Sequence, residues 1–272
     1  MNTSAIQKLK RYFRQDPNIL LAFLFGSAAK NRETEDSDVD IALFLKDKKE
    51  ESAIWTKIST LLKKEIDLVL LDEAPATLVS AIFKTGIALV VKDEKLYWNL
   101  YLQKSMESED FANFADSYWG IYLRSRSLIP EDKARLLERL QFLEQELSEI
   151  DRFKNITFQE YQQEKPKRRE IERWVENIIN AMIDIAKIFL ASEKKDMPKT
   201  YEEALRDFAL IAGLKEKQTL SFSQFARLRN ILAHEYLGVL YGEIRNFIEG
   251  FPILYEKISK FLMQYLKNKR IT

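Results

Sequence analysis

The sequence of 272 residues contains no cysteine and a single histidine, His234. The lack of cysteine excludes a disulfide scaffold, a cysteine nucleophile and a thiolate zinc site. A single histidine excludes a metal centre built from several histidines and a relay between two of them. Any acid–base chemistry by an imidazole must therefore use His234.

Glycine and proline are also scarce, with seven and six residues, whereas 31% of the residues are charged. This composition is typical of a helix-rich chain. No apolar run approaches the roughly 20 residues of a membrane span, and Met1 opens onto a polar stretch. We therefore expect a cytoplasmic protein that does not contact a membrane. The net charge of +1 provides no broad basic field, so we expect no DNA partner and only local contacts with RNA.

The first third of the chain alternates strand-like and helix-like segments, and 46% hydrophobic residues allow a sizeable core. Apolar runs at 19–25, 39–45, 66–71 and 87–91 predict four strands, and residues 50–64 have helical spacing. Strands that alternate with helices predict an α/β or α+β domain with a mixed sheet, and of the two we expect α+β.

The chain beyond residue 94 shows no convincing strand. Helical spacing recurs at 96–127, 133–153, 167–190, 201–211 and 244–267. Ser221 with Gln224 predicts the start of a further helix, which Gly238 is placed to end. Pro130 interrupts this pattern and suits the first turn of a new helix. We therefore predict two domains, residues 1–129 and 130–272, of which the second is an all-α helical bundle.

The first informative motif lies around the first two strands. Gly26 and Ser27 follow one strand, where glycine lets the backbone approach a phosphate and free amides suit an anion. Asp38 and Asp40 are two residues apart on the next strand, so both carboxylates lie on one face. Two adjacent carboxylates repel each other unless a cation neutralises them, and hard oxygen ligands suit Mg²⁺. Asp67 in the third strand supplies a further carboxylate if that strand lies alongside.

Gly26-Ser27 followed by Asp38-x-Asp40 resembles the polymerase-β-like nucleotidyltransferases in their minimal (MNT) form, over about residues 1–125. The resemblance implies that ATP is a substrate, that Gly26 and Ser27 hold its phosphates and that Asp38 and Asp40 bind Mg²⁺. It also implies that Asp67 completes the catalytic and metal-binding set and helps to activate the attacking hydroxyl.

The chain departs from this family at one place. Where the family often has Arg-Gly four and five residues after the motif glycine, this sequence has Lys30 and Asn31. Lys30 keeps the positive charge, so we expect it to contact the nucleotide. Asn31 changes the loop, which leaves the nucleotide preference open.

The second informative motif is Arg229-Asn230-x-x-x-His234-x-Tyr236, near the end of a helix. Asn230 and His234 share a helical face, whereas Arg229 and His234 differ by about 140°. They converge only if the helix loosens or if two copies face each other. A neutral imidazole suits proton transfer in RNA cleavage, and a guanidinium suits the phosphate. A structural histidine beside a helix-end arginine is the alternative that the residues alone leave open.

This motif resembles the R-N-x-x-x-H-x-Y motif of HEPN ribonucleases in HepT-like toxins, over about residues 131–268. Arg173-Trp174-Val175-Glu176 and Met182-Ile183-Asp184-Ile185-Ala186 fit the same group. The resemblance implies a homodimer with a ribonuclease cleft at its interface. It implies that Arg229 and His234 form the catalytic pair and that Asn230 supports them.

The two resemblances together imply a functional link. In toxin–antitoxin pairs, MNT proteins neutralise HepT-like toxins by transferring AMP to the tyrosine beside the histidine, which here is Tyr236. The leading hypothesis is a self-neutralising fusion that modifies Tyr236 within one chain or on a partner chain. A second interpretation is a small-molecule, aminoglycoside-type nucleotidyltransferase whose bundle shapes the acceptor pocket. A third is a non-enzymatic binding or assembly module.

Overall fold

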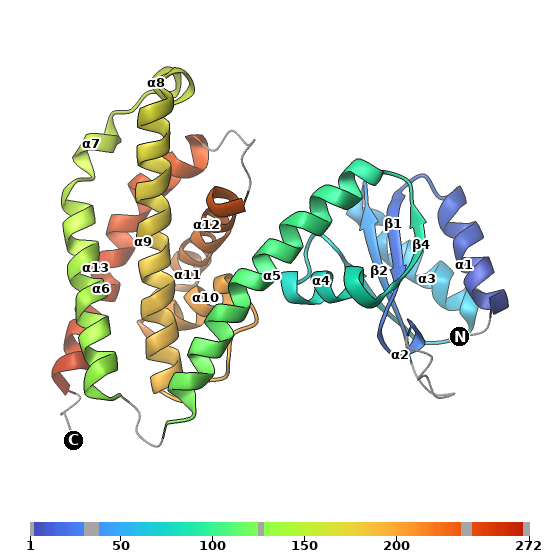
Figure 1. Cartoon of the computed structure of the whole chain (residues 1–272), viewed down its shortest axis with the longest axis horizontal. Coiled ribbons are helices and arrows are strands. Elements are labelled where there is room, and N and C mark those ends of the chain that lie inside the picture. Colours follow the sequence, from blue (N-terminus) through green and yellow to red (C-terminus); the bar gives the residue numbers. More distant parts are fainter. Residues whose placement is uncertain (1–2, 30–37, 125–127, 235–240, 269–272) are drawn as a thin grey trace. The chain divides into compact units, whose positions relative to one another are not determined.

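The computed structural model of the chain describes residues 3–29, 38–124, 128–234 and 241–268, without the side chain of His234. It consists of two compact units, Met1–Glu109 and Asp110–Thr272 (Figure 1). Lys30 and Tyr236, both named in the sequence motifs, lie outside the described residues.

The first unit is built around a four-stranded mixed sheet with the order β3-β2-β1-β4. The middle pair β1 and β2 is antiparallel, β4 is antiparallel to β1, and β3 is parallel to β2. The predicted mixed sheet is confirmed, and each strand begins at the predicted residue. The strands are β1 (Ile19–Leu24), β2 (Val39–Leu45), β3 (Ile66–Leu70) and β4 (Ile87–Val91).

Helices cover both faces of this sheet (Figure 1). Alternate residues of β2 enter two separate cores: Val39, Ile41 and Leu43 pack with α1 and α3, whereas Ala42 lies on the side of α4 and the beginning of α5. Because side chains alternate along a strand, Asp40 shares the face of Ala42. The helices of this unit are α1 (Thr3–Gln15), α2 (Gly26–Ala29), α3 (Glu51–Leu62) and α4 (Ala76–Thr85), with the short η1 (Lys48–Glu50) before α3.

The second unit begins within α5 (Glu94–Tyr122), and its described residues form helices and connecting turns without a strand. The predicted helical bundle is confirmed, and the predicted helix at 201–211 matches α10 at both ends. The remaining helices are α6 (Pro130–Ser148), α7 (Asp151–Lys154), α8 (Phe158–Gln163), α9 (Lys165–Ser192), α10 (Tyr201–Ile211), α11 (Glu216–Ser223), α12 (Phe225–His234) and α13 (Tyr241–Asn268).

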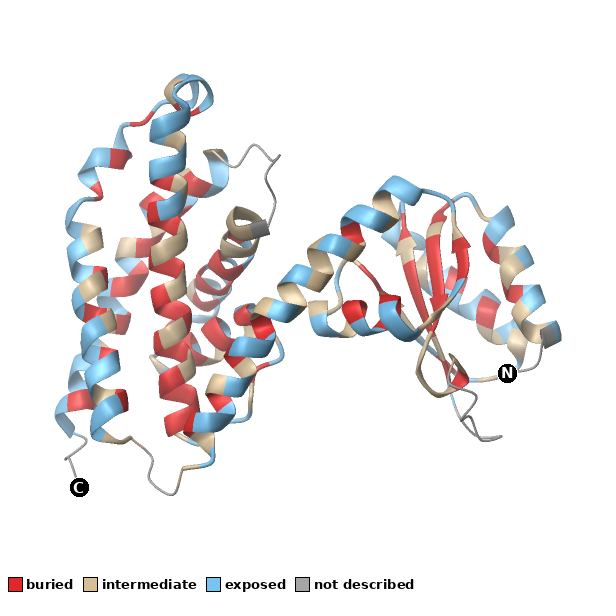
Figure 2. Cartoon of the chain, in the orientation of Figure 1, coloured by how far each residue is buried: buried red, intermediate tan, exposed pale blue. Residues whose placement is uncertain are grey.

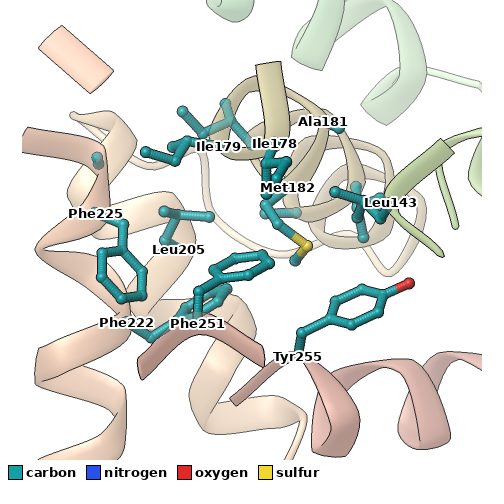
Figure 3. Packing of buried hydrophobic residues seen from close by; sticks show 14 of the residues in the cluster. Leu143, Ile178, Ile179, Ala181, Met182, Leu205, Phe222, Phe225, Phe251 and Tyr255 are labelled. Atoms are coloured by element: carbon teal, nitrogen blue, oxygen red, sulfur yellow. The ribbon is translucent and has the colours of Figure 1, made fainter. Parts of the chain in front are cut away.

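Helix α9 occupies the centre of this unit. Its buried residues face helices on several sides, and Figure 2 shows buried residues along its length. Aromatic rings from α11, α12 and α13 pack together beside Met182 of α9 (Figure 3). The rings of Phe225 and Phe251 lie 5.8 Å apart, and those of Phe247 and Phe251 lie 4.8 Å apart. This packing holds α12, which carries the second motif, against α9.

The boundary between the two units differs from the predicted one at 129/130. The compact units divide between Glu109 and Asp110, within α5. The reason is that the later part of this helix belongs to the helical core, where it buries Phe111, Phe114 and Tyr118. The hydroxyl of Tyr118 donates hydrogen bonds to the carbonyl oxygens of Lys195 (2.7 Å) and Asp196 (3.1 Å). Proline at residue 130 begins α6 as predicted but does not separate the units.

No helix in the described part of the chain combines the length and apolar character needed to cross a membrane.

Candidate functional sites

The register of the parallel pair β2 and β3 places two carboxylates side by side. Asp40 of β2 is the register partner of Asp67 of β3. Asp38 lies one residue before β2 and is exposed, whereas Asp40 is partly buried. The strand of Asp67 thus lies alongside the strand of Asp40, which is the arrangement in which Asp67 can share a site with Asp40.

Gly26 adopts a backbone conformation that favours glycine. It follows β1 with a φ angle of +67°, in the left-handed region. A Cβ atom at this position would lie 1.9 Å from Oδ2 of Asp40. The backbone N–H of Phe25 also donates to the carbonyl oxygen of Asp40 at 3.0 Å. Only glycine allows the chain to turn into α2 this close to the carboxylate.

The electrostatic environment of Asp40 is unfavourable to its charge. Burial raises the pKa of Asp40, and the neighbouring carboxylates of Asp67 and Asp38 raise it further. Hydrogen bonds from the backbone of Asp40 itself and of Ser27 oppose this rise. The net direction is upward, so the site carries like charges that a bound cation would relieve.

The donor set suits a divalent cation by its chemistry, since carboxylate oxygens are ligands that Mg²⁺ prefers. The carboxylates of Asp67 and Asp38 add to the effect of burial in raising the pKa of Asp40, and a bound cation would relieve this repulsion. The distances between the carboxylates are larger than a three-ligand metal site requires. Among the described residues, no group of three or more carboxylate or histidine side chains is close enough to hold a metal. Asp40 and Asp67 are therefore neighbours, but the described arrangement is not a closed three-carboxylate cage.

The second site is centred on Arg229 of α12. Its Nε atom donates to Oδ1 of Asn180 in α9 at 2.8 Å, and its Nη1 atom donates to Oδ2 of Asp110 in α5. A longer contact of 3.4 Å joins Nη1 to Oδ1 of Asn230. The side chain of Arg229 is 11% exposed, so its charge is balanced mainly by protein groups rather than by water.

An aromatic ring completes this site. The guanidinium carbon of Arg229 lies 5.2 Å from the ring centre of Tyr201, at the start of α10, within the range of a cation–π contact. The hydroxyl of Tyr201 donates to the carbonyl oxygen of Asp110 at 3.1 Å. Burial raises the pKa of Tyr201, and the carboxylate of Asp110 adds to this effect. Tyr201 therefore acts here as a neutral ring and hydrogen-bond donor.

The remaining motif residues lie at the end of the same helix. Asn230 is next to Arg229, and His234 is the last residue of α12. The chain is helical over the whole interval from Arg229 to His234, so ideal geometry keeps them about 140° apart. Asn230 contacts Arg229 in the structure. Helix α12 does not loosen between Arg229 and His234, so the two positions lie on different faces of one helix.

Three residues of this site were not anticipated from the sequence. Asn180 had a local signal, because it is a polar residue within the apolar stretch from Ile178 to Ile183 of α9. Tyr201 follows Thr200, whose side chain accepts from the backbone N–H of Glu203 and begins α10. No local sequence pattern indicated Asp110, because its side chain contacts Arg229 from 119 positions earlier in the sequence.

Two family models match separate regions of the chain. Residues 7–95 match the family model described as polymerase beta, nucleotidyltransferase, and residues 143–261 match the model described as ribonuclease HepT-like. The first match contains Gly26, Asp38, Asp40 and Asp67, and the second contains Arg229 and His234. Asp110 lies in neither matched region. No curated protein matches the chain.

Several solved structures resemble part of the chain. One is a toxin–antitoxin crystal structure with AMP-PNP, 24% identical, which covers 43% of this chain and 98% of its own, with a TM-score of 0.34. Another is a tri-AMPylated Shewanella oneidensis HEPN toxin in complex with MNT antitoxin, 21% identical, with the same coverage and a TM-score of 0.33.

Proposed function

We propose that this chain, which joins a polymerase-β-type nucleotidyltransferase region to a HepT-like ribonuclease region, is a self-neutralising toxin–antitoxin fusion. Its first region transfers AMP from ATP to Tyr236, and this modification blocks RNA cleavage by the second. The observation that carries the proposal is that both family matches, each with its motif residues, occur in one chain. The toxin–antitoxin pairing itself comes from the motif resemblance.

In the transfer reaction, the phenol oxygen of Tyr236 attacks the α-phosphorus of ATP. A bond forms between them, the bond to the pyrophosphate oxygen breaks, and Asp67 accepts the phenolic proton. Gly26, Ser27 and Lys30 bind the phosphates of ATP. Asp38 and Asp40, with Asp67, would hold Mg²⁺, which neutralises charge on the phosphates when bound. Burial raises the pKa of Asp40, and the further rise caused by the carboxylates of Asp67 and Asp38 supports this assignment, because it reflects adjacent negative charges.

In RNA cleavage, the guanidinium of Arg229 binds the phosphate and stabilises its additional charge. The imidazole of His234 takes the proton of the attacking 2′-hydroxyl or protonates the leaving oxygen. Asn230 supports Arg229, as its contact with Nη1 suggests. Because Arg229 and His234 differ in direction on one helix, we propose that two copies of the chain complete the cleft as a homodimer. AMP on Tyr236 would block this cleft by its size and its charge.

The experiment uses donor and acceptor forms of the full chain. The acceptor carries Asp38→Ala and Asp40→Ala, so it cannot modify itself, and the donor carries Tyr236→Phe. Each variant is incubated with ATP and Mg²⁺ alone and in a mixture with the other, the unmutated chain is incubated separately, and added AMP is located by peptide mass spectrometry. We expect AMP on Tyr236 of the acceptor in the mixture if transfer occurs between chains, and on Tyr236 of the unmutated chain alone if it occurs within one chain.

Absence of AMP on Tyr236 in every sample, starting from protein shown to be unmodified, would reject the self-neutralising model. Transfer of AMP from the unmutated chain to an aminoglycoside in the same assay would favour the small-molecule nucleotidyltransferase. RNA cleavage by the Asp38→Ala/Asp40→Ala chain, lost on Arg229→Ala, tests the ribonuclease half separately.

A further inference from the structure

Asp110 supplies a charged partner to Arg229 from outside both regions that match known families. It lies on α5, between residues 7–95 and 143–261. Its Oδ2 atom accepts from Nη1 of Arg229, and its side chain is 29% exposed whereas that of Arg229 is 11% exposed. The carboxylate is therefore the more accessible member of the pair.

The position of Asp110 is fixed by further contacts. The hydroxyl of Tyr201 holds the carbonyl oxygen of Asp110 at 3.1 Å, and the ring of the same tyrosine lies beside Arg229. Asn180 occupies Nε of Arg229 at 2.8 Å. Nearby on the same helix, Phe111 and Phe114 are buried against the ring of Tyr201. The backbone of Asp110 is thus held against the core of the helical unit, and its partly exposed carboxylate is presented to Arg229 from a packed helix.

A carboxylate and a phosphodiester compete for the same N–H donors of a guanidinium. Both present anionic oxygens that accept its N–H groups, and arginine binds either in similar geometry. They cannot accept the same N–H at full strength, and the negative charge of Asp110 repels a phosphate that approaches the site. An RNA phosphate bound by Nη1 must therefore displace this carboxylate or share the donor with it.

We propose that Asp110 is an internal competitor for the RNA phosphate at Arg229 and sets the affinity of the site for its substrate. This inference rests on one part of the proposed function, the binding of an RNA phosphate by Arg229. Asp110 neutralises the guanidinium while no RNA is bound. RNA must displace this carboxylate, and the free energy of the displacement lowers the affinity for RNA. A residue that only positioned Arg229 for catalysis would have the opposite effect, because its removal would lower the cleavage rate and leave RNA affinity unimproved.

The test measures RNA binding by the full chain in the Asp38→Ala/Asp40→Ala background, which keeps Tyr236 unmodified. The probe is a labelled RNA oligonucleotide with 2′-O-methyl groups, which cannot be cleaved through its 2′-hydroxyls. Asp110→Asn removes the charge and preserves the shape of the side chain. We expect it to tighten binding on the order of tenfold, the scale of removing one like charge beside a phosphate.

Matched variants separate this effect from a general loss of negative charge. Asp116→Asn makes the same change at an exposed position of the same helix, and we expect a change in affinity below about twofold. Asp110→Glu keeps the charge and should bind RNA as weakly as the parent. Asp110→Ser serves as a second neutral variant if Asp110→Asn does not fold, as judged by thermal unfolding.

The outcomes distinguish this inference from the proposed function. Unchanged or weaker binding by both neutral Asp110 variants overturns the competition, even if the parent cleaves RNA through Arg229. Tighter binding that survives Arg229→Ala also overturns it, because the phosphate then does not reach Arg229. Tighter binding that Arg229→Ala abolishes supports the competition. If the parent then fails to cleave an unmodified RNA, the ribonuclease proposal fails while the assignment of Asp110 stands.

Discussion

In the first unit, Asp38, Asp40 and Asp67 bring negative charges together; burial raises the pKa of Asp40, and the two neighbouring carboxylates raise it further. In the helical unit, by contrast, the guanidinium of Arg229 is paired with Asp110, donates a hydrogen bond to Asn180 and lies against an aromatic ring. The first site is electrostatically incomplete until a cation binds, whereas the second is already neutralised by the protein. Under the proposed function, the first site needs a bound cation, and the second needs the carboxylate of Asp110 to move away from Arg229.

The two sites also differ in how the chain assembles them. The first arises from neighbouring strands, where residue alternation and a parallel register place Asp40 beside Asp67. The second draws on four helices, α5, α9, α10 and α12, that meet only through tertiary packing. A substitution in the sheet site should therefore act locally on charge and geometry. A substitution around Arg229 should affect the stability of the helical unit as well.

The strongest way to break the sheet site is Gly26→Ala. The added Cβ would lie 1.9 Å from Oδ2 of Asp40 and the φ angle of +67° is strained for alanine, so the carboxylate must move. We expect AMP transfer to fall by roughly a hundredfold or more, the effect of misplacing a reacting group by about 1 Å. The measurement is the initial rate of AMP incorporation into the Asp38→Ala/Asp40→Ala acceptor chain, with a Gly26→Ala donor.

Gly120→Ala is the matched control, since a Cβ atom at Gly120 in α5 meets nothing within 4 Å. Alanine there should leave transfer unchanged and stabilise the helix by up to about 1 kcal/mol. An active Gly26→Ala variant would mean that the close approach of Gly26 to Asp40 is not needed for the reaction.

The corresponding change in the helical site is Arg229→Lys, which keeps the charge and removes the planar fork. A single ammonium group cannot donate to both Asn180 and Asp110 in the present geometry. We expect RNA cleavage in the Asp38→Ala/Asp40→Ala background to fall by about a hundredfold, the scale of losing one transition-state donor. Arg227→Lys, at an exposed position of the same helix, should have little effect. Equal losses from both variants would argue against a specific role for Arg229.

The sheet site was easier to predict from the sequence than the helical site, because neighbouring strands form the first and tertiary packing of helices forms the second. The strands and the pair Gly26 and Asp40 were predictable because apolar runs, a glycine after a strand and period-two spacing are local signals. Helix α1 also carried such a signal, with Ile6, Leu9 and Phe13 at helical spacing, but it was not predicted. The contact between Asp110 and Arg229 leaves no local trace, because helix packing creates it.

The domain boundary illustrates the same limit. A proline and a change of pattern placed it at Pro130, yet the later part of α5 packs into the helical core. Periodicity predicts that a segment is helical and which face is apolar. It does not predict which of two neighbouring cores buries that face, because the answer depends on the helices available on each side.

A smaller change sharpens the charge comparison within the sheet site. Asp67→Asn removes a carboxylate that raises the pKa of Asp40, so this pKa should fall toward its ordinary value while burial keeps it above that value. A raised native pKa means that folding favours protonated Asp40, and its contribution to stability is lost as pH rises through that pKa. Without Mg²⁺, the variant should therefore be more stable than the parent at pH 7 and should gain less stability when Mg²⁺ is added. Thermal unfolding with and without Mg²⁺, and a carboxyl titration by NMR, check both signs.

The smallest expected effect concerns the support beneath Arg229. Thr200 caps α10 by accepting from the backbone N–H of Glu203 at 3.0 Å, and the next residue, Tyr201, contacts both Arg229 and Asp110. Thr200→Ala should lower the free energy of unfolding by about 1 kcal/mol, the usual cost of losing such a cap. Thr157→Ala removes the equivalent cap of α8, which contributes no residue to this site, and serves as the comparison. If the helical site depends on tertiary packing, Thr200→Ala should also weaken RNA cleavage whereas Thr157→Ala should not. Equal cleavage by the two variants would show that Tyr201 keeps its place without the cap and that the packing of α10, rather than its first turn, holds Arg229.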